Sequence, residues 1–209
     1  MASPFIYARD ISDAWYKSVR YTLENGYEYT IDRGSFEGHS RKQLASFALE
    51  ILHPESRPLS IEHNGLVISS SKAIAKYFGY LTNPEMHENE TYTYGNRISK
   101  WLPAIAGMLT ETPGTNQATI EVGEPSDVTL SDPPCLRVIS WKVIENKKLQ
   151  MSVFFRSWDC VNGLPFNLGG LQLLNELVAG SADLKPGPMI AYSDGIHVYD
   201  MSYNVLEGK

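Results

Sequence analysis

One cysteine of this sequence stands where a side chain could be both fixed and reachable. Cys135 follows Pro133-Pro134 and opens a run rich in β-forming residues. A thiolate is a strong nucleophile, so a thiol at such a position could carry covalent chemistry. The commoner role of a free cysteine is buried and structural, and this role suits Cys160 better because Trp158 and Val161 are its neighbours. The residues alone leave both roles open for Cys135.

A cation, a hydroxyl and a carboxylate follow one another closely at Arg156, Ser157 and Asp159. A guanidinium and a hydroxyl can bind a phosphate together, since the first supplies a forked pair of donors and the second supplies another. The competing interpretation is a surface arginine that forms an ion pair with Asp159. The residues alone favour this second interpretation.

His197 and Tyr199 alternate on a predicted strand, so their side chains point to the same side and could bind a sugar hydroxyl jointly. A histidine satisfied within the core is the commoner outcome. A hydrolase dyad of Cys135 and His197 is a weaker alternative, because the sequence supplies no orienting third group and no oxyanion loop. The five histidines and two cysteines never fall at the spacing of metal ligands, so no metal site is expected.

The charge balance limits the ligands that these residues could serve. The chain has 209 residues, with 18 Lys and Arg against 24 Asp and Glu, and a net charge of −6. Neither a nucleic acid nor an anionic membrane is therefore expected as a partner. No apolar run approaches the roughly 20 residues of a membrane span, and the start lacks a signal-peptide pattern. A cytoplasmic location with reduced cysteines is expected.

The elements that must hold these residues mix helical and strand patterns. Ile11, Trp15, Val19 and Leu23 recur every four residues and predict a helix over residues 11–24. Strands are expected over 27–31 and 45–52, and helices over 70–80 and 98–109. A loop over 32–41 contains two arginines and several small residues, so its backbone amides could approach an anion.

The second half predicts an antiparallel hairpin, because residues 135–144 and 149–156 are β-rich and flank a polar turn. Cys135, Arg137, Ile139 and Trp141 would then share one face. A helix over 168–179 and a last strand over 189–199 follow. The sequence thus predicts an α+β fold, with a mixed or antiparallel β-sheet flanked by helices, in a single domain over residues 1–209.

Four motifs taken in order form one pattern: Pro133-Pro134-Cys135, Arg156-Ser157-x-Asp159, Gly163-Leu-Pro-Phe-Asn167 and His197-x-Tyr199. Their order, spacing and residue types resemble the thymidylate synthase family. The resemblance extends back to Tyr94-Gly95 and is faint before Tyr94. Leu136 after the cysteine is most similar to the short archaeal or phage-type branch, which is related to deoxypyrimidine monophosphate hydroxymethylases.

The resemblance implies a transferase with a covalent mechanism. A Cys135 thiolate would add to C6 of a pyrimidine nucleoside monophosphate, and C5 would attack the methylene of the co-substrate 5,10-methylenetetrahydrofolate. Asn167 offers a donor and an acceptor to the O4 and N3–H pair of uracil, although a flipped amide would suit cytosine. The conversion of dUMP to dTMP is therefore favoured.

The family's site residues carry over by position, with Cys135 as the nucleophile and Tyr94 as a second catalytic residue. The substrate would be bound by Arg33, Arg156 and Ser157 at the 5'-phosphate, Asp159 and Asn167 at the base, and His197 and Tyr199 at the 3'-hydroxyl. Asp159 and Gly163 would contact the folate. The family also implies a homodimer joined through a sheet face, to which the aromatic strands over 138–143 and 150–155 would contribute.

Two positions depart from the family pattern in ways that affect catalysis. Asn116-Gln117 stand where the family has paired arginines that the partner subunit donates to the phosphate. The helix expected over 70–80 carries no carboxylate for general acid-base catalysis. Glu50, Glu55 and Glu90 are the remaining candidates for that role.

Further departures bear on the product. Asp132 stands where the family has an apolar residue, and the sequence ends ten residues after Tyr199, whereas family enzymes continue with a tail that excludes water. Water that reached the methylene intermediate would give a hydroxymethyl product. A 5-hydroxymethylase acting on dUMP, dCMP or CMP is therefore the alternative. A non-catalytic nucleotide-binding protein is the second alternative, against which the retained Cys135 argues.

Overall fold

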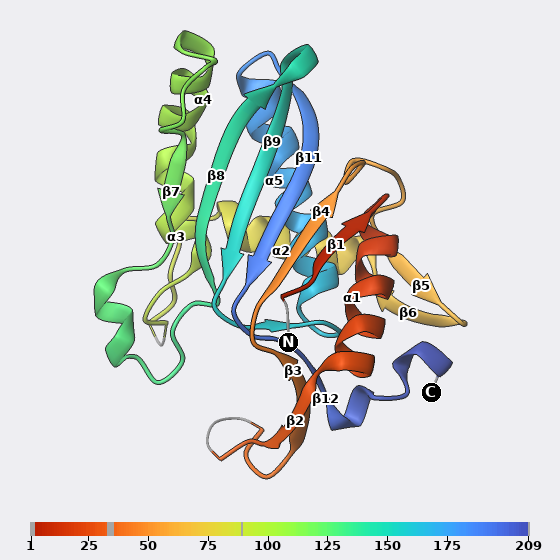
Figure 1. Cartoon of the computed structure of the whole chain (residues 1–209). Helices are drawn as coiled ribbons and strands as arrows, with labels where there is room; N and C mark the ends of the chain where they lie inside the picture. Colours follow the sequence, from red (N-terminus) through yellow and green to blue (C-terminus); the bar gives the residue numbers. More distant parts are fainter. Residues whose placement is uncertain (1–2, 33–35, 89, 209) are drawn as a thin grey trace.

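A six-stranded mixed β-sheet forms the centre of the fold (Figure 1). The computed structural model describes residues 3–32, 36–88 and 90–208. The order of the strands is β1 (Phe5–Ala8), β4 (Phe47–Ile51), β11 (Lys185–Ser193), β9 (Lys148–Phe155), β8 (Leu136–Ile144) and β7 (Thr119–Glu121). β1 and β4 are parallel, as are β9 and β11, whereas the other neighbours are antiparallel. The α+β fold with a mixed sheet is confirmed.

A second sheet meets the end of the first. Its order is β10 (Trp158–Asp159), β12 (Ile196–Tyr199), β3 (Ser40–Leu44) and β2 (Tyr27–Thr30), and a separate hairpin pairs β5 (Ile61–His63) with β6 (Leu66–Ser69). Residues 156–157 lead from β9 to β10, and residues 194–195 lead from β11 to β12. These two passages, termed the sheet corner below, are joined by hydrogen bonds from Asp194 N to Phe155 O (3.2 Å) and from Trp158 N to Gly195 O (3.1 Å).

Helices cover one face of the large sheet. α5 (Leu164–Ser181) lies behind the sheet in Figure 1 and is buried along most of its length, and α2 (Ser71–Thr82) packs against it. α1 (Ile11–Asn25) packs beside β1, while α3 (Tyr94–Ile98) and α4 (Leu102–Glu111) lie on the β7 side. Short 3-10 segments occupy Ser99–Trp101, Pro125–Thr129, Glu145–Lys147, Asp200–Ser202 and Val205–Glu207. One continuous core joins these elements.

The predicted hairpin is confirmed as β8 and β9. Its 3-10 turn contains two residues in the left-handed region, Asn146 and Lys147. Residues of β9 alternate between buried and half-buried. On β8 the pairing skips one residue between Leu136 and Val138. This bulge interrupts the strict alternation that was expected to start at Cys135.

Several predicted boundaries were wrong, although the helices over 11–24 and 70–80 and the strand over 45–52 are confirmed as α1, α2 and β4. The helix expected over 98–109 is split, because α4 restarts at Leu102 with Pro103 in its first turn. The helix expected over 168–179 begins four residues earlier, at Leu164. The strand expected over 189–199 is two strands in different sheets, because the chain turns at Asp194-Gly195.

Gly95→Ala should destabilise the protein by about 1–3 kcal/mol, the usual cost of forcing extra volume into a packed site. A Cβ at position 95 would lie 1.8 Å from the carbonyl oxygen of Asn83. Gly107→Ala in α4 is the matched control, because nothing lies within 4 Å of its Cβ position and alanine in a helix is about 0.5–1 kcal/mol better than glycine. Urea denaturation measures both variants, and equal midpoints would contradict the steric argument.

Candidate active site

Cys135 lies immediately before β8, beside the sheet corner, with its side chain partly exposed. Arg156 fixes its turn through three hydrogen bonds. The backbone N of Arg156 donates to Cys135 O (2.9 Å), its Nε donates to Pro134 O (3.2 Å), and its Nη2 donates to Pro133 O. The cysteine is therefore fixed and still accessible. Cys160, in contrast, is fully buried, with Thr22 Oγ1 at 3.8 Å from its sulfur, as its neighbours predicted.

The ion pair that was favoured between Arg156 and Asp159 is wrong. Arg156 pairs instead with Asp132, whose Oδ1 lies 3.6 Å from Nη2 and whose side chain is 93% exposed. Asp159 accepts hydrogen bonds from Val161 N (2.8 Å) and Asn162 N (3.0 Å), so its carboxylate caps the turn that leads into α5. The guanidinium of Arg156 thus lies beside Cys135 rather than beside this turn.

The pKa of the Cys135 thiol is raised above its ordinary value. Burial is the largest cause, the Arg156 guanidinium lowers the pKa, and the Asp132 carboxylate raises it. The thiol form therefore predominates near neutral pH in the free protein. Because the thiolate is the reactive species, the proton must leave before Cys135 can attack.

Tyr94 and three further tyrosines flank the cysteine. Tyr94 Oη accepts a hydrogen bond from Leu136 N (3.1 Å), the amide that follows Cys135. The ring centroids of three neighbours lie 5.4–6.5 Å from that of Tyr94: Tyr77, Tyr80 and Tyr92. Burial raises the pKa of Tyr92 to about 12 and also raises the pKa of Tyr94. These phenols therefore stay protonated close to the thiol, and the sequence analysis identified only Tyr94 among them.

A buried ion network fixes α3, which carries Tyr94, against β8. Asp127 is 1% exposed and accepts hydrogen bonds from Arg97 Nη1 (2.8 Å) and Nη2 (2.6 Å) and from Arg137 Nη1 (2.9 Å). The bonds from Arg97 are the main reason why the pKa of Asp127 lies well below its usual range. The sequence analysis missed Asp127, because no local spacing links it to Arg97 on a different element.

The early start of α5 places Asn167 in its first turn, next to β10. Trp158 Nε1 donates to Asn167 Oδ1 at 2.8 Å. Gly163 lies against both neighbours, since a Cβ there would be 3.0 Å from Asp159 O, a tight contact, and 3.5 Å from Asn167 Oδ1. The structure thus brings together the predicted residues Asp159, Gly163 and Asn167.

His197 and Tyr199 lie together on β12, with ring centroids 4.8 Å apart. His197 Nδ1 is 2.9 Å from Gly195 O, which can only accept, so Nδ1 carries the proton and Nε2 is an acceptor. His197 is 3% exposed, and within the described part of the chain Nε2 has no hydrogen-bond partner. Burial is the main reason that its pKa is lowered. This unpaired acceptor distinguishes His197 from a satisfied core histidine and suits a ligand hydroxyl.

Arg41 is a cation of this site that the sequence analysis placed only in a loop. It lies on β3 opposite Tyr199, and its charge lowers the pKa of His197 and counteracts the rise in the pKa of Tyr199. The sequence analysis did not predict β3, because its first four residues, Ser-Arg-Lys-Gln, are all polar and show no strand pattern. Arg33, which was expected to bind phosphate, lies outside the described residues, as do its two following neighbours. Ser157 lies at the sheet corner directly after Arg156.

The candidate glutamates do not gather at Cys135. Glu50 pairs with Tyr7 across β1 and β4, away from the buried face of the sheet, and Glu55 Oε1 lies 3.4 Å from His53 Nδ1. Glu90 accepts a hydrogen bond from His87 N (2.8 Å) and raises the pKa of Tyr80, which burial raises most. Asn116-Gln117 lie in an exposed loop before β7. Among these candidates Glu90 comes nearest to the tyrosines around Tyr94.

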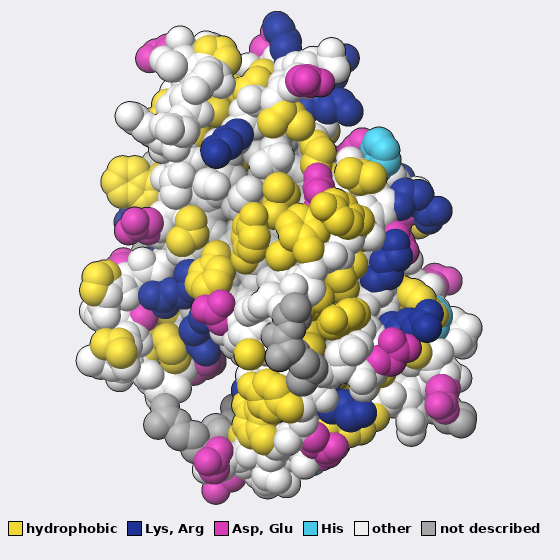
Figure 2. All heavy atoms as spheres, in the orientation of Figure 1, with side chains coloured by type: hydrophobic (Ala, Val, Ile, Leu, Met, Phe, Trp, Pro, Cys, Tyr) yellow, Lys and Arg dark blue, Asp and Glu magenta, His cyan; other side chains and the backbone are white. Residues whose placement is uncertain are grey.

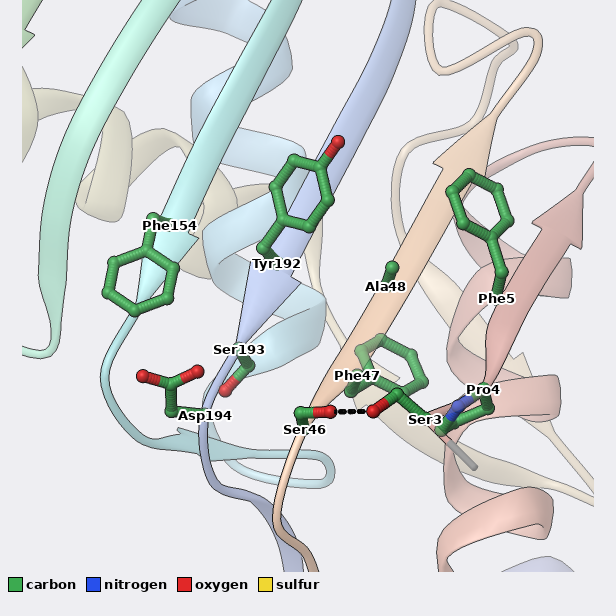
Figure 3. A pocket seen from close by; sticks show the side chains of 10 residues that line it. All are labelled: Ser3, Pro4, Phe5, Ser46, Phe47, Ala48, Phe154, Tyr192, Ser193 and Asp194. Atoms are coloured by element: carbon green, nitrogen blue, oxygen red, sulfur yellow. Dashed lines mark hydrogen bonds between the residues drawn. The ribbon is translucent and has the colours of Figure 1, made fainter. Parts of the chain in front are cut away.

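Two cavities lie away from these residues. One, of about 440 Å³, opens between β1, β4, β9 and β11, with Phe5, Phe154 and Tyr192 in its wall (Figure 3). The other, of about 380 Å³, lies at the start of α1 beside Arg57. Across the described ranges, no cluster of three or more His, Cys, Asp or Glu side chains could bind a metal ion. Across the same ranges, no helix is long and apolar enough to span a membrane.

Comparison with known proteins explains this grouping of residues. The family model for thymidylate synthase matches residues 73–208, which include α3, the hairpin and the sheet corner. The chain belongs to the thymidylate synthase family. Members of this family are C5 methyltransferase-type enzymes that bind a pyrimidine nucleotide and use methylenetetrahydrofolate as co-substrate, and the same holds for this enzyme.

Relatives cover nearly the whole chain. Proteins named "Putative thymidylate synthase" from Methanosarcina acetivorans and Methanopyrus kandleri are 28% and 27% identical to it. These alignments cover 97% and 92% of this chain and 92% and 91% of the relatives. A protein named "Thymidylate synthase" from Novosphingobium aromaticivorans is 32% identical over 106 residues, which are 50% of this chain and 33% of that protein. The similarity therefore extends to the first half, where the motifs are faint.

The pH dependence of alkylation should report the charges around Cys135. Iodoacetamide should label Cys135 faster as pH rises, with a midpoint above that of an ordinary thiol, because burial raises its pKa. Asp132→Asn should lower the midpoint and Arg156→Gln should raise it, whereas Arg156→Lys keeps the charge and should change it less. Mass spectrometry measures the labelling, with Cys135→Ala as the blank. A midpoint that is the same in all variants would contradict this electrostatic account.

Proposed function

We propose that this enzyme transfers a one-carbon unit from methylenetetrahydrofolate to C5 of a pyrimidine deoxynucleoside monophosphate, with dUMP to dTMP as the favoured reaction. The observation that carries the proposal is the placement of Cys135. Its turn is fixed by Arg156, it lies one residue from the amide bound by Tyr94, and it is the accessible thiol of the two. A cysteine held in this way suits covalent catalysis on an electrophilic ring carbon.

In the proposed reaction Cys135 forms and later breaks one bond to C6 of the ring. Addition of the thiolate moves electron density to C5 and O4, and C5 then bonds to the methylene carbon of the co-substrate. Loss of the C5 proton allows elimination of the tetrahydrofolate. Hydride transfer from tetrahydrofolate to the exocyclic methylene and release of the thiolate give the 5-methyl nucleotide and dihydrofolate. Tyr94 and its neighbours supply protonated donors beside the developing negative charge.

The remaining predicted residues bind different parts of the nucleotide. Arg156 and Ser157 bind the 5'-phosphate at the sheet corner, Asn167 binds the base edge, and the unpaired Nε2 of His197, with Tyr199, binds the 3'-hydroxyl. Asp159 and Gly163 contact the base and folate side, while Arg33 stays a predicted phosphate ligand. A cytoplasmic location also stays a prediction.

Incubation with 5-fluoro-dUMP and methylenetetrahydrofolate tests this proposal. The fluorine at C5 cannot leave as a proton does, so a covalent adduct should accumulate on Cys135 and be visible by mass spectrometry. Cys135→Ala should form no adduct and show no turnover while retaining its fold and nucleotide affinity. Cys160→Ala should still form the adduct. Nucleotide binding without any adduct or turnover in the wild type would instead support the non-catalytic binding protein.

One observation favours a second candidate, the 5-hydroxymethylase. Asp132 beside Cys135 has a side chain that is 93% exposed, so a charged and hydrated group borders the position of the intermediate. Water that captured the exocyclic methylene would give a 5-hydroxymethyl nucleotide and leave tetrahydrofolate unoxidised. Dihydrofolate absorbance together with product mass separates the two reactions with dUMP and with dCMP. Replacing Asp132 with Leu would shift a hydroxymethylase towards methyl product and change a methylase little.

Arg156→Ala should weaken nucleoside monophosphate binding by roughly 1.5–3 kcal/mol, the range for hydrogen bonds to a charged group. Binding of the corresponding nucleoside should change much less, because it lacks the phosphate. Calorimetry with dUMP and deoxyuridine measures the difference. Equal losses for both ligands would show that Arg156 acts only through the Pro133-Pro134 turn.

We propose further that the enzyme is a homodimer, joined through the face of the large sheet that is opposite α5. No helix covers this face in Figure 1, and Figure 2 shows hydrophobic side chains across its middle. Phe5, Tyr7 and Tyr192 on this face are 47%, 62% and 43% exposed. An apolar area of this kind on an antiparallel or mixed sheet favours burial by a second copy.

Light scattering at micromolar concentration should therefore give twice the chain mass of 23.4 kDa. The double variant Tyr7→Lys and Tyr192→Lys should shift the mass towards the monomer, because it places charges within the apolar face. Val128→Lys is the control, since Val128 is 86% exposed and lies outside this face. A wild-type monomer would contradict the dimer.

A further inference from the structure

The amide of Asn167 has a fixed orientation. An indole N–H is a donor only, so the 2.8 Å contact from Trp158 Nε1 must meet the oxygen of the amide and not its nitrogen. This contact removes the ambiguity between the two ends of the amide. Asn167 Nδ2 therefore points away from Trp158, with two N–H groups left to donate.

Trp158 has little freedom to release the amide. Its side chain is 2% exposed, and its ring is stacked on Phe155 with centroids 4.3 Å apart and an interplanar angle of 4°. Its backbone N donates to Gly195 O at the sheet corner (3.1 Å). Burial, the stacking on Phe155 and the anchored backbone thus hold the indole in place, and its N–H holds the Asn167 amide.

A second donor lies beside Asn167. Tyr77 reaches α5 from α2 at Gly170, where a Cβ would lie 2.5 Å from Tyr77 Cδ1. Asn167 and Gly170 are three residues apart on α5 and so share one side of the helix. The Tyr77 hydroxyl is buried and has no hydrogen-bond partner in the part of the chain that is described.

The chemistry of this pair is that of donors. The pKa of Tyr77 lies well above its usual value, mainly because the side chain is buried. The nearby Tyr94 raises this pKa further, whereas the Asn167 amide lowers it. The phenol therefore stays protonated, and its O–H meets no acceptor among the described residues. Tyr77 also lies within electrostatic range of Cys135.

We propose that Trp158, acting through Asn167, and Tyr77 together set the preference of this site for a 4-keto pyrimidine over a 4-amino pyrimidine. The inference rests on the proposed function, in which Asn167 binds the base edge. It adds Trp158, which decides which end of the amide is offered, and Tyr77, which supplies a second donor. A carbonyl O4 accepts from these donors. A 4-amino group is itself a donor and would face unpaired N–H and O–H groups.

The test compares the affinities for dUMP and dCMP by calorimetry. The wild type should prefer dUMP by at least about tenfold, the effect of one hydrogen bond near the upper end of the usual range. Trp158→Phe keeps an aromatic ring on Phe155 but removes the N–H, so the amide can turn and the preference should fall about tenfold. Tyr77→Phe should weaken dUMP binding by a similar factor and leave dCMP binding nearly unchanged.

Trp141→Phe is the matched control. Trp141 is also buried, and its Nε1 has no hydrogen-bond partner among the residues described, so the same change of ring should leave the preference intact. An unchanged preference in folded Trp158→Phe and Tyr77→Phe would overturn the inference. If Trp158→Phe does not fold, the Tyr77→Phe variant and the wild-type affinity ratio still test the inference. A wild type that binds dCMP as tightly as dUMP would also overturn the inference.

Failure of the proposed function gives a different result. A wild type that forms no adduct with 5-fluoro-dUMP and binds neither nucleotide would overturn the function and this inference together. A wild type that forms the adduct and prefers dUMP, with a preference that Trp158→Phe does not change, would overturn the inference alone. The adduct assay and the affinity ratio therefore separate the two claims.

Discussion

Two hydrogen bonds at the sheet corner hold the parts of the candidate active site in register. β9 and β11 are parallel neighbours in the large sheet, and their continuations β10 and β12 are again parallel neighbours in the small one. The bonds from Asp194 N to Phe155 O and from Trp158 N to Gly195 O span the gap between them. Because both strands turn together, Arg156 stays beside Cys135 while His197 enters the small sheet directly after the turn. A change in one passage would move both groups.

The helices behind the sheet add a second constraint, which links packing to chemistry. α2 approaches α5 at Gly169 and Gly170, where a Cβ would meet Ile74 at 2.9 Å and Tyr77 at 2.5 Å. Such an approach leaves no room for larger residues on α5. The same contact sets the position of the Tyr77 hydroxyl beside Asn167. Core packing and the composition of the site are therefore not independent in this enzyme.

The sequence predicted what local periodicity and motif order determine. α1 and the β8–β9 hairpin have strong patterns, and the order of motifs from Cys135 to Tyr199 identified the family. β3 could not be found in this way, because polar residues dominate it and its pairing with β12 joins distant parts of the chain. The Asp127 network was also not predicted, because it joins distant parts of the chain. Arg97, Asp127 and Arg137 meet only after α3 packs against β8. The favoured pairing of Arg156 with Asp159 failed because nearness in sequence does not determine direction at a sheet corner.

Arg156, the proposed phosphate ligand, also holds the turn before Cys135 in place. Its Nε and Nη2 already donate to the carbonyls of Pro134 and Pro133, and a guanidinium has five N–H groups in a rigid plane. The groups that remain are therefore held in a fixed direction before any phosphate arrives. Such preorganisation removes part of the entropy cost of binding, which a freely rotating surface arginine would still incur. The carbonyl contacts that make Arg156 look structural would thus also suit it to its proposed role at the phosphate. Its charge favours the thiolate of Cys135 from the same position.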